Sequence, residues 1–357
     1  MKKIDSIGYS VFFENGFDSL AQFLKEKAYS KIFILTDRNT EEHCLPVLTS
    51  AMPSDFIYDI IEIDPGEENK NIDFCIGIWK MLLDFGADRN SLLINLGGGV
   101  VTDMGGFAAS TFKRGIDFVQ IPTTLLSQVD ASIGGKTGID LDAVKNIIGT
   151  FTQPQAVFIH VGFLKTLHKR QLVSGFAEMI KHAFIFDAEY LQELEDFDFE
   201  NPDAKMIYRS VEIKNEVVIQ DPKESGLRKI LNFGHTIGHA VETYSLDHDN
   251  NPLLHGEAIA VGMICEAYLS YKFNGLKEDQ LQKVLQVIRK IFPHYKLKSS
   301  TFSVLIEIMK NDKKNSDDKI GFALLTDIGH CSFNHYLEED KIKAALTYYQ
   351  EKIQRVS

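Results

Sequence analysis

The sequence is poor in cysteine and contains no long hydrophobic run. Its 357 residues include four cysteines, Cys44, Cys75, Cys265 and Cys331, which are widely spaced and form no C-x-x-C pair. This spacing argues against a disulfide framework and against a cysteine zinc site, and it predicts reduced thiols. No apolar stretch approaches the ~20 residues that a membrane span requires, so a membrane is not an expected partner.

Basic residues are also in deficit. There are 38 lysines and arginines against 50 aspartates and glutamates, which gives a net charge of −12. Binding to a nucleic-acid backbone needs a basic face, so the composition argues against nucleic acid as a partner. The N-terminal sequence MKKIDSIGYSVFFENG has neither the sustained apolar segment nor the cleavage site of a secretory signal. We therefore expect a cytoplasmic protein.

The hydrophobic pattern changes its period along the chain. Over the first part, strand-like runs at 31–37, 55–64, 91–96, 117–122 and 156–161 alternate with helical patterns. This alternation predicts an α/β domain, Rossmann-like, with a mostly parallel sheet. From about Leu164 onward the period is three to four, which predicts helices, with one late hairpin near 319–333. We expect an α/β domain over 1–162 and an all-α domain over 163–357.

A glycine-rich segment follows one of the strand-like runs. In LINLGGGVVTDMGGF (93–107), Gly97, Gly98 and Gly99 stand between the strand and a helix. Backbone N–H groups at a helix N-terminus bind phosphate, and glycine permits the close approach that this requires. Thr102 occupies the third glycine position of G-x-G-x-x-G, so a tight turn without a ligand explains the segment about as well.

Polar residues at other strand ends are expected at the same edge of the sheet. Asp37 ends one strand and could bind a ribose hydroxyl or cap the next helix. Glu67 and Lys70 follow another strand, in a run that a solvated turn would also explain. Thr123 and Thr124 follow a third strand. Because the carboxyl ends of parallel strands share one edge, these side chains together predict a nucleotide crevice.

The segment SIGGKTGIDLDAVKNIIG (132–149) carries Lys136, Lys145 and Asn146 around several glycines. A lysine beside a glycine turn is a good hydrogen-bond donor to an anion. The alternative is a surface hairpin whose lysines are solvated.

The helix predicted in GFAEMIKHAF (175–184) puts charged residues into an apolar stretch. Glu178 and Lys181 are three residues apart and His182 is four from Glu178, so all three project from one face. A surface ion pair is the ordinary explanation and contributes little. In an apolar setting, however, a buried charge needs a partner such as a metal or a ligand.

Two histidines stand one helical turn apart in LNFGHTIGHA (231–240). On a helix, His235 and His239 lie on the same side, either as zinc ligands or as hydrogen-bonded core residues. His255, in LLHGEAIAVGM (253–263), precedes a helix of small residues and is a third donor. One carboxylate and two neutral imidazoles would form an open zinc site. The spacing does not decide which two histidines bind.

These motifs resemble the 3-dehydroquinate synthases of the sugar-phosphate cyclase family. The resemblance extends in family order from about Asp37 to the DKK of 312–314, and it is carried by LGGGVVTDMGGF, RGIDFVQIPTTLLSQVDASIGGKTGID, KNIIG, SGFAEMIKHA, LNFGHTIGHA and LHGEAIAVGM. It implies a homodimeric enzyme with NAD and one divalent metal, Zn2+ or its substitute Co2+, in the cleft between a Rossmann-like and a helical domain. It implies a carbon–oxygen lyase that converts 3-deoxy-D-arabino-heptulosonate 7-phosphate to 3-dehydroquinate and phosphate, in the shikimate pathway to chorismate and the aromatic amino acids.

The resemblance also assigns roles residue by residue. It implies that Glu178, His235 and His255 are the metal ligands and places His239 in the substrate site. It assigns the nucleotide to Glu67, Lys70, Gly99, Asp103, Thr123, Thr124, Lys136, Lys145 and the segment from Phe163 to Thr166. It assigns the substrate to Arg114, Asp130, Lys136, Asn146, Lys181, Lys214, Arg228, Asn232, His239 and one of Lys313 or Lys314. Several separate cations suit a substrate that carries both a phosphate and a carboxylate.

Four features depart from the family pattern. Thr102 replaces a glycine, Asp140 replaces an asparagine and His160 replaces an aspartate, and all three bear on nucleotide contacts. SLDHDNNPL (245–253) lengthens the link before His255 and introduces His248 as a rival imidazole.

Three other functions share parts of the pattern. A sister cyclase that acts on sedoheptulose 7-phosphate would need fewer cations, because its substrate has no carboxylate. A metal-dependent polyol or glycerol-phosphate dehydrogenase would share the two-domain plan but release NADH. A catalytically inactive nucleotide-binding protein would have no use for an intact metal triad.

Overall fold

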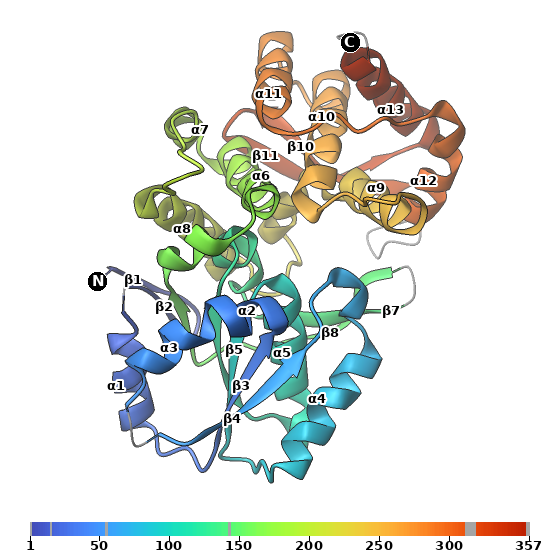
Figure 1. Ribbon diagram of the computed structural model, residues 1–357. Coiled ribbons are helices and arrows are strands. Elements are labelled where there is room, and N and C mark those ends of the chain that lie inside the picture. Colours follow the sequence, from blue (N-terminus) through green and yellow to red (C-terminus); the bar gives the residue numbers. More distant parts are fainter. Residues whose placement is uncertain (1, 15, 54–55, 142–143, 311–318, 355–357) are drawn as a thin grey trace. The chain divides into compact units, whose positions relative to one another are not determined.

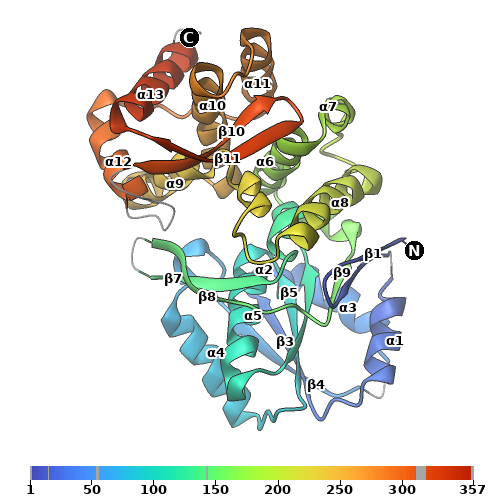
Figure 2. The same ribbon diagram turned by 180° about the vertical axis from the view of Figure 1, so that it is seen from behind.

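A computed structural model describes residues 2–14, 16–53, 56–141, 144–310 and 319–354. The chain divides into two units, each shown from two sides in Figures 1 and 2. The first comprises Met1–Leu172 and Asp198–Asn215, and the second comprises Val173–Phe197 and Glu216–Ser357. Residues 163–172 and 198–215, which the predicted boundary after 162 places in the second domain, thus group with the first unit.

The first unit is built on a seven-stranded sheet in the described part of the chain, with spatial order β1-β2-β9-β6-β5-β3-β4. Neighbouring strands are parallel except β1 and β2, which are antiparallel. The strands are β1 (Lys2–Asp5), β2 (Ser10–Phe13), β3 (Ile32–Asp37), β4 (Tyr58–Ile63), β5 (Leu92–Gly97), β6 (Asp117–Pro122) and β9 (Ala156–Ile159). The five predicted runs are β3, β4, β5, β6 and β9, and the mostly parallel sheet is confirmed.

Helices cover both faces of this sheet because successive strand residues point to opposite sides. Phe33 and Leu35 of β3 pack in the core formed with α4 and α5, whereas Ile32 and Ile34 pack in the core formed with α1 and α3. The helices are α1 (Asp18–Glu26), α2 (Arg38–His43), α3 (Leu45–Ala51), α4 (Ile72–Asp84) and α5 (Gly99–Thr111). This layered arrangement is the predicted Rossmann-like fold.

Short elements connect the strands and helices of this unit, and most of them follow the carboxyl end of a strand. An antiparallel hairpin, β7 (Lys136–Leu141) with β8 (Val144–Phe151), packs on α5. The short helical elements are η1 (Glu67–Asn69), η2 (Phe112–Arg114), η3 (Ser127–Ala131) and η4 (Val161–Thr166). The segment 132–149 therefore contains a hairpin, as one of its two interpretations predicted.

The second unit is mostly helical, and α10 is its central helix. Helix α10 is buried along most of its length and contacts α9, α11, α13 and β10. The elements of this unit are α7 (Ala188–Leu194), η5 (Leu227–Asn232), α9 (His235–His248), α10 (His255–Phe273), α11 (Glu278–Ile291), η6 (Ser299–Thr301), α12 (Phe302–Lys310), β10 (Ile320–Asp327), β11 (His330–Leu337) and α13 (Glu339–Gln354). Two helices, α6 (Lys169–Phe186) and α8 (Ala204–Gln220), contribute residues to both units. The late hairpin is confirmed as β10 and β11.

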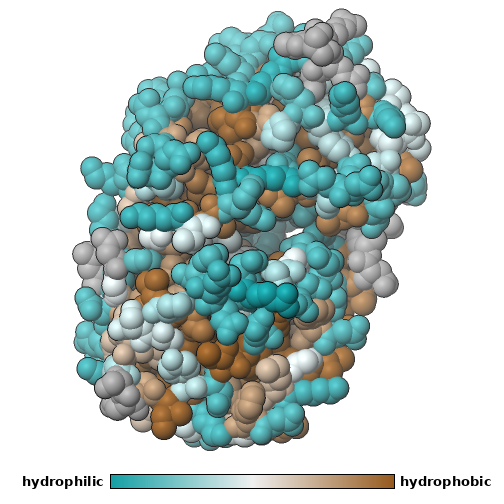
Figure 3. Space-filling model, in the orientation of Figure 1, coloured by the Kyte–Doolittle hydropathy of each residue, from teal (hydrophilic) through white to brown (hydrophobic). Residues whose placement is uncertain are grey.

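The surface mixes polar and apolar side chains. Figure 3 shows hydrophilic residues interspersed with hydrophobic ones over the visible face. Large exposed apolar side chains include Ile57 directly before β4, Leu83 in α4 and Phe151 at the end of β8, which are far apart in the sequence. None of the described helices combines the length and the apolar character that crossing a bilayer demands.

Candidate active site

Helix α6 brings a carboxylate and an ammonium group into the interior. Glu178 is 0% exposed and Lys181 is 1% exposed. Nζ of Lys181 donates to Oε2 of Glu178. The other oxygen, Oε1, is buried and finds no hydrogen-bond partner among the described residues. The pair is therefore not a surface ion pair, and Oε1 has the environment of an atom that a bound cation would satisfy.

Two imidazoles approach this oxygen from different helices. Nε2 of His235 and Nε2 of His255 each lie 3.6 Å from Oε1 of Glu178. His235 is the first residue of α9 and His255 is the first residue of α10. A separation of 3.6 Å is too long for a hydrogen bond. It is close to the separation, about 3.4 Å, of two ligands that bind one tetrahedral ion at about 2.1 Å.

The second nitrogen of each imidazole has a partner that fixes the ring. Nδ1 of His255 lies 2.9 Å from Oε2 of Glu242, and Nδ1 of His235 lies 3.2 Å from the carbonyl oxygen of Phe233. Such outer partners hold a metal-binding histidine in one orientation, with the free nitrogen toward the ion. Both rings are therefore held with Nε2 toward Glu178.

His239 lies beside the same group, one turn after His235. Its ring centroid is 5.1 Å from that of His235 and 5.7 Å from that of His255, and the ligand atoms of the three histidines lie within 4.8 Å of one another. His248, the rival imidazole, is at the opposite end of the 14-residue helix α9, about 20 Å away. Its ring stacks on Tyr244 at 4.2 Å.

Burial and neighbouring charges set the protonation of these groups. Burial raises the pKa of Glu178, but the charge of Lys181 and the two imidazoles outweigh burial and hold this pKa well below its usual range. Burial and the charge of Lys181 hold the pKa of His235 well below its usual value, so this imidazole is neutral. Burial opposes protonation of His255, but the carboxylates of Glu242 and Glu178 raise its pKa to about 10. A carboxylate that stays charged and a neutral imidazole are ligands that Zn2+ accepts, and binding of the ion by His255 would release the proton from that imidazole.

The first unit holds a second polar cluster at the carboxyl edge of its sheet. Lys70 is 4% exposed, and its Nζ donates to Oδ2 of Asp103 at 2.6 Å and to Oδ1 of Asn146 at 2.7 Å. Nζ of Lys145 donates to Oε1 of Glu67 at 2.8 Å. Burial lowers the pKa of Lys70, but the carboxylates, Asp103 first, raise it above its usual value. Five residues assigned to nucleotide or substrate by resemblance therefore share one network.

Asp140, which departs from the family pattern, belongs to the same cluster. Its Oδ1 accepts from the backbone N–H of Asn146 at 2.6 Å, and its Oδ2 lies 3.6 Å from Nζ of Lys145. Asn146 has a positive φ of 50°, a conformation that costs energy for a residue other than glycine. The hydrogen bond from its N–H to Asp140 stabilises this turn.

The glycine segment forms the start of α5. Gly98 is the N-cap and Gly99 is the first helical residue. A Cβ atom on Gly98 would lie 3.0 Å from Cγ2 of Thr124, so the backbone passes close to the next strand end. The hydroxyl of Thr102 donates back to the carbonyls of Gly98 and Gly99, so the threonine is satisfied within its own helix.

Other strand-end residues have structural partners of their own. Oδ1 of Asp37 accepts from the backbone N–H of Thr40 at 2.9 Å and caps α2, which is the alternative role for this residue. Oγ1 of Thr123 is buried and unpaired within the described chain. Phe163 packs in the apolar core against His160, and Oγ1 of Thr166 donates to the carbonyl of Phe163.

The remaining predicted substrate residues are found in both units. In the first, Nζ of Lys214 donates to Oδ1 of Asp130 at 2.7 Å, Lys136 is exposed at the start of β7, and Arg114 has a positive φ of 71°. In the second, Arg228 is 2% exposed and donates to the carbonyl of Pro222 at 2.8 Å. Lys313 and Lys314 lie outside the described residues.

The structure adds one residue that the sequence reasoning missed. Oε1 of Glu224 accepts from Nδ2 of Asn232. Glu224 has a positive φ of 59°, and such strain concentrates at functional sites. The signal in the sequence was the second acid of DPKESGLR (221–228), four residues before the predicted substrate residue Arg228.

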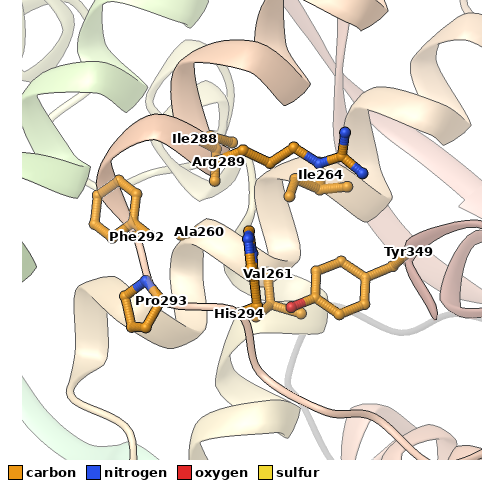
Figure 4. A pocket seen from close by; sticks show the side chains of 9 residues that line it. All are labelled: Ala260, Val261, Ile264, Ile288, Arg289, Phe292, Pro293, His294 and Tyr349. Carbon is orange, nitrogen blue, oxygen red and sulfur yellow. The ribbon is translucent and has the colours of Figure 1, made fainter. Parts of the chain in front are cut away.

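The second unit also has a small pocket that none of the candidate metal ligands lines. It is lined by apolar side chains of α10 and α11 together with Arg289, His294 and Tyr349 (Figure 4). Its volume of about 10 Å³ has room for about one water molecule, which is too little for a sugar phosphate.

Known proteins resemble the whole chain. Residues 60–174 match the N-terminal domain of 3-dehydroquinate synthase and residues 175–315 match its C-terminal domain. The chain is 43% identical over 336 residues to the 3-dehydroquinate synthase of Parabacteroides distasonis, which covers 93% of this chain and 95% of that protein. It is 39% identical over 347 residues to that of Campylobacter jejuni subsp. jejuni, with 94% and 98% covered. Its structure is similar to ValA, a 2-epi-5-epi-valiolone synthase from Streptomyces hygroscopicus with NAD+ and Zn2+ bound, with a TM-score of 0.86, 28% identity and 99% of both chains covered.

Proposed function

The chain belongs to the 3-dehydroquinate synthase family, and from this premise we propose which of its residues carry the reaction. The enzyme converts 3-deoxy-D-arabino-heptulosonate 7-phosphate to 3-dehydroquinate and phosphate, using NAD and a divalent metal. It is a phosphate-eliminating lyase of the shikimate pathway.

We propose that Glu178, His235 and His255 hold the metal. The observation that carries this proposal is the buried, unpaired Oε1 of Glu178, with Nε2 of both imidazoles 3.6 Å away, within the described part of the chain. Glu178 contributes negative charge, and Glu242 and the Phe233 carbonyl orient the two rings. Zn2+ fits this donor set, and three protein ligands leave a coordination position open.

The nucleotide is assigned to the polar cluster of the first unit. The N-terminus of α5, at Gly98 and Gly99, offers backbone N–H groups to the pyrophosphate. Lys70 and Lys145 supply positive charge, and Asp103 keeps Lys70 in place through a 2.6 Å hydrogen bond. Asp37 caps α2 through its Oδ1. Its Oδ2 is the oxygen that we assign to a ribose hydroxyl.

Cations and amides would bind the anionic ends of the sugar phosphate. Arg228, Asn232 and Lys181 serve this purpose in the second unit, and Arg114, Lys136, Asn146 and Lys214 do so in the first. Asp130 and His239 are assigned to substrate hydroxyls instead, because a carboxylate would repel an anionic group. Separate positive groups suit separate phosphate and carboxylate charges, which is the reason to prefer this substrate to one without a carboxylate.

When bound, the metal polarises substrate hydroxyls, and NAD accepts a hydride and later returns it. Lys181 holds Glu178 in the charged form throughout, because its ammonium group donates to Oε2. His239, one turn from His235, is close enough to the triad to hold a substrate hydroxyl there. The protein groups mainly fix the pose in which elimination and ring closure occur.

An assay of phosphate release with each of two sugars tests the function. We expect release from the heptulosonate phosphate, dependence on added Zn2+ after chelation, and no accumulation of NADH. Activity on sedoheptulose 7-phosphate alone would favour the sister cyclase. Net formation of NADH would favour a polyol dehydrogenase.

We also propose that the enzyme acts in the cytoplasm as a homodimer, as is usual in the family. Sedimentation equilibrium of the purified chain measures its mass. A mass of one chain, 40.3 kDa, under assay conditions would contradict the dimer.

A further inference from the structure

Helix α9, which begins with the metal-ligand candidate His235, has no cap from its own sequence. The N-cap residue is Gly234, which has no side chain and a positive φ of 82°, and the third helical residue is Ile237. In a capping box, a side chain at the N-cap satisfies the N–H of the third residue, and a side chain at the third residue satisfies the N–H of the N-cap. Neither side chain is available here.

A carboxylate from another helix replaces both. Glu266 of α10 is 0% exposed. Its Oε2 accepts from the N–H of Gly234 at 2.6 Å, and its Oε1 accepts from the N–H of Ile237 at 3.2 Å. These are the two donors that a capping box satisfies, so one buried side chain of α10 caps α9.

Close packing of the two helices makes this contact reachable. A Cβ atom on Gly238 would lie 2.7 Å from Cδ1 and 3.0 Å from Cα of Ile259. A Cβ atom on Gly262 would lie 2.7 Å from the backbone nitrogen of Gly238. Glycines on both helices therefore allow their backbones to approach, and Glu266 lies one helical turn beyond Gly262.

We propose that Glu266 is a positioning residue for the metal site. The inference rests on the ligand set Glu178, His235 and His255 proposed above. Helix α10 begins with His255 and, through Glu266, fixes the backbone on both sides of His235. That backbone includes the Phe233 carbonyl, which contacts Nδ1 of His235 and sets its ring. One helix thus holds both histidines in register.

The test is the affinity of the folded protein for Zn2+, measured by competition with a chromophoric chelator. Glu266→Ala is expected to weaken binding by about 10- to 100-fold, as loss of an outer partner of a metal ligand does. The matched control is Asp187→Ala. Asp187 caps α7 in the same unit by accepting from two backbone N–H groups, each at 3.1 Å, and α7 carries no ligand candidate. We expect this control to lower stability and leave Zn2+ affinity unchanged.

Further variants separate the outcomes. Glu266→Gln keeps one acceptor, so its loss of affinity is expected to be smaller than that of Glu266→Ala. Unchanged affinity in Glu266→Ala, or in Glu266→Gln if the alanine variant does not fold, would overturn the proposal. So would an equal loss in Asp187→Ala. If the wild type and His235→Ala bind Zn2+ equally, the proposed ligand set has failed; if only His235→Ala loses the ion while the Glu266 variants keep it, this inference alone has failed.

Discussion

Oε1 of Glu178 lies 3.6 Å from Nε2 of His235, and both atoms come from buried residues on different helices. A cation between these two atoms would be attracted by the negative charge of the carboxylate. Glu178→Gln removes this charge, and we expect a loss of metal affinity larger than the ~10- to 100-fold caused by an outer partner. Metal content after dialysis checks the loss of metal, and phosphate release measured on the same sample checks the loss of activity that follows from it.

His239→Ala is the matched comparison for that variant. We expect it to retain metal and to lose activity by at least ~10²-fold, since a misplaced substrate costs about that much. Retention of metal by Glu178→Gln together with its loss in His239→Ala would reverse the two assignments.

Lys70→Met tests the cluster of the first unit. The substitution leaves Asp103 partly buried without its cation, and we expect the free energy of unfolding to fall by roughly 3 kcal/mol and NAD affinity to fall with it. The double variant Lys70→Met, Asp103→Asn is expected to recover stability but not NAD affinity. Urea unfolding and NAD titration distinguish the two effects. Full NAD affinity in the double variant would contradict the assignment.

Gly262→Ala tests the close contact of α9 and α10. A Cβ atom there would overlap the carbonyl oxygen of Gly234, so the helices must separate, at a cost of about 1–3 kcal/mol. We expect weaker metal binding as well. Gly77→Ala is the control: it stands in α4, a Cβ atom there would meet no described atom within 4 Å, and we expect a gain of up to ~1 kcal/mol. Equal urea midpoints for the two variants would count against the packing argument.

The protein is expected to lose stability at alkaline pH because the thiols of Cys44 and Cys75 are buried. Burial raises the pKa of Cys44 and of Cys75 to about 12, whereas an unfolded thiol titrates near a pKa of about 8.5. Between these values the unfolded chain binds fewer protons than the folded one. The free energy of unfolding therefore falls as pH rises, by up to about 1.4 kcal/mol per pH unit for each thiol. The stability difference between wild type and Cys44→Ala, Cys75→Ala should narrow from pH 9 to 11, and a constant difference would refute this.

Asn95 is a buried polar residue whose replacement is expected to stabilise the fold. It is 0% exposed, and neither atom of its amide has a hydrogen-bond partner in the described structure. Asn95→Leu keeps the approximate size, and we expect a gain of about 1–3 kcal/mol in thermal or urea unfolding. Gln120→Met is the contrast, since Nε2 of Gln120 donates to the carbonyl of Thr102 at 2.9 Å and its loss should destabilise. A stability loss in Asn95→Leu would point to a buried water.

The hydrophobic pattern of the sequence predicted those helices and strands whose formation depends on neighbouring residues. The apolar run at 31–37 became β3, and Glu178 and Lys181 share a face of α6 because residues three apart on a helix do so. The short strands β1 and β2 were not predicted. They have four residues each, and half of those in β1 and β2 together are not apolar. β1 pairs with β2, and β2 joins the sheet through β9, which is distant in the sequence.

The candidate metal ligands could be predicted from the sequence because each of them lies in a motif of its own. Glu178, His235 and His255 could be named from three separate segments, but spacing left open which histidines approach the carboxylate. Glu266 could not be found in this way, because its partners, the N–H groups of Gly234 and Ile237, are defined only by how two helices pack. His248 was a reasonable rival in sequence, and only the length of α9 removes it from the triad.

The chain passes from one unit to the other at residues 172/173, 197/198 and 215/216. The first unit therefore has all its residues only after the ribosome has synthesised most of α8, through Asn215, when residues 173–197 of the second unit are already made. No single cut of the gene yields either unit by itself, because a fragment of residues 1–215 includes 173–197 of the second unit and a fragment of residues 173–357 includes 198–215 of the first. A fragment that ends near residue 172 lacks residues 198–215, so its expression is expected to give an incomplete first unit.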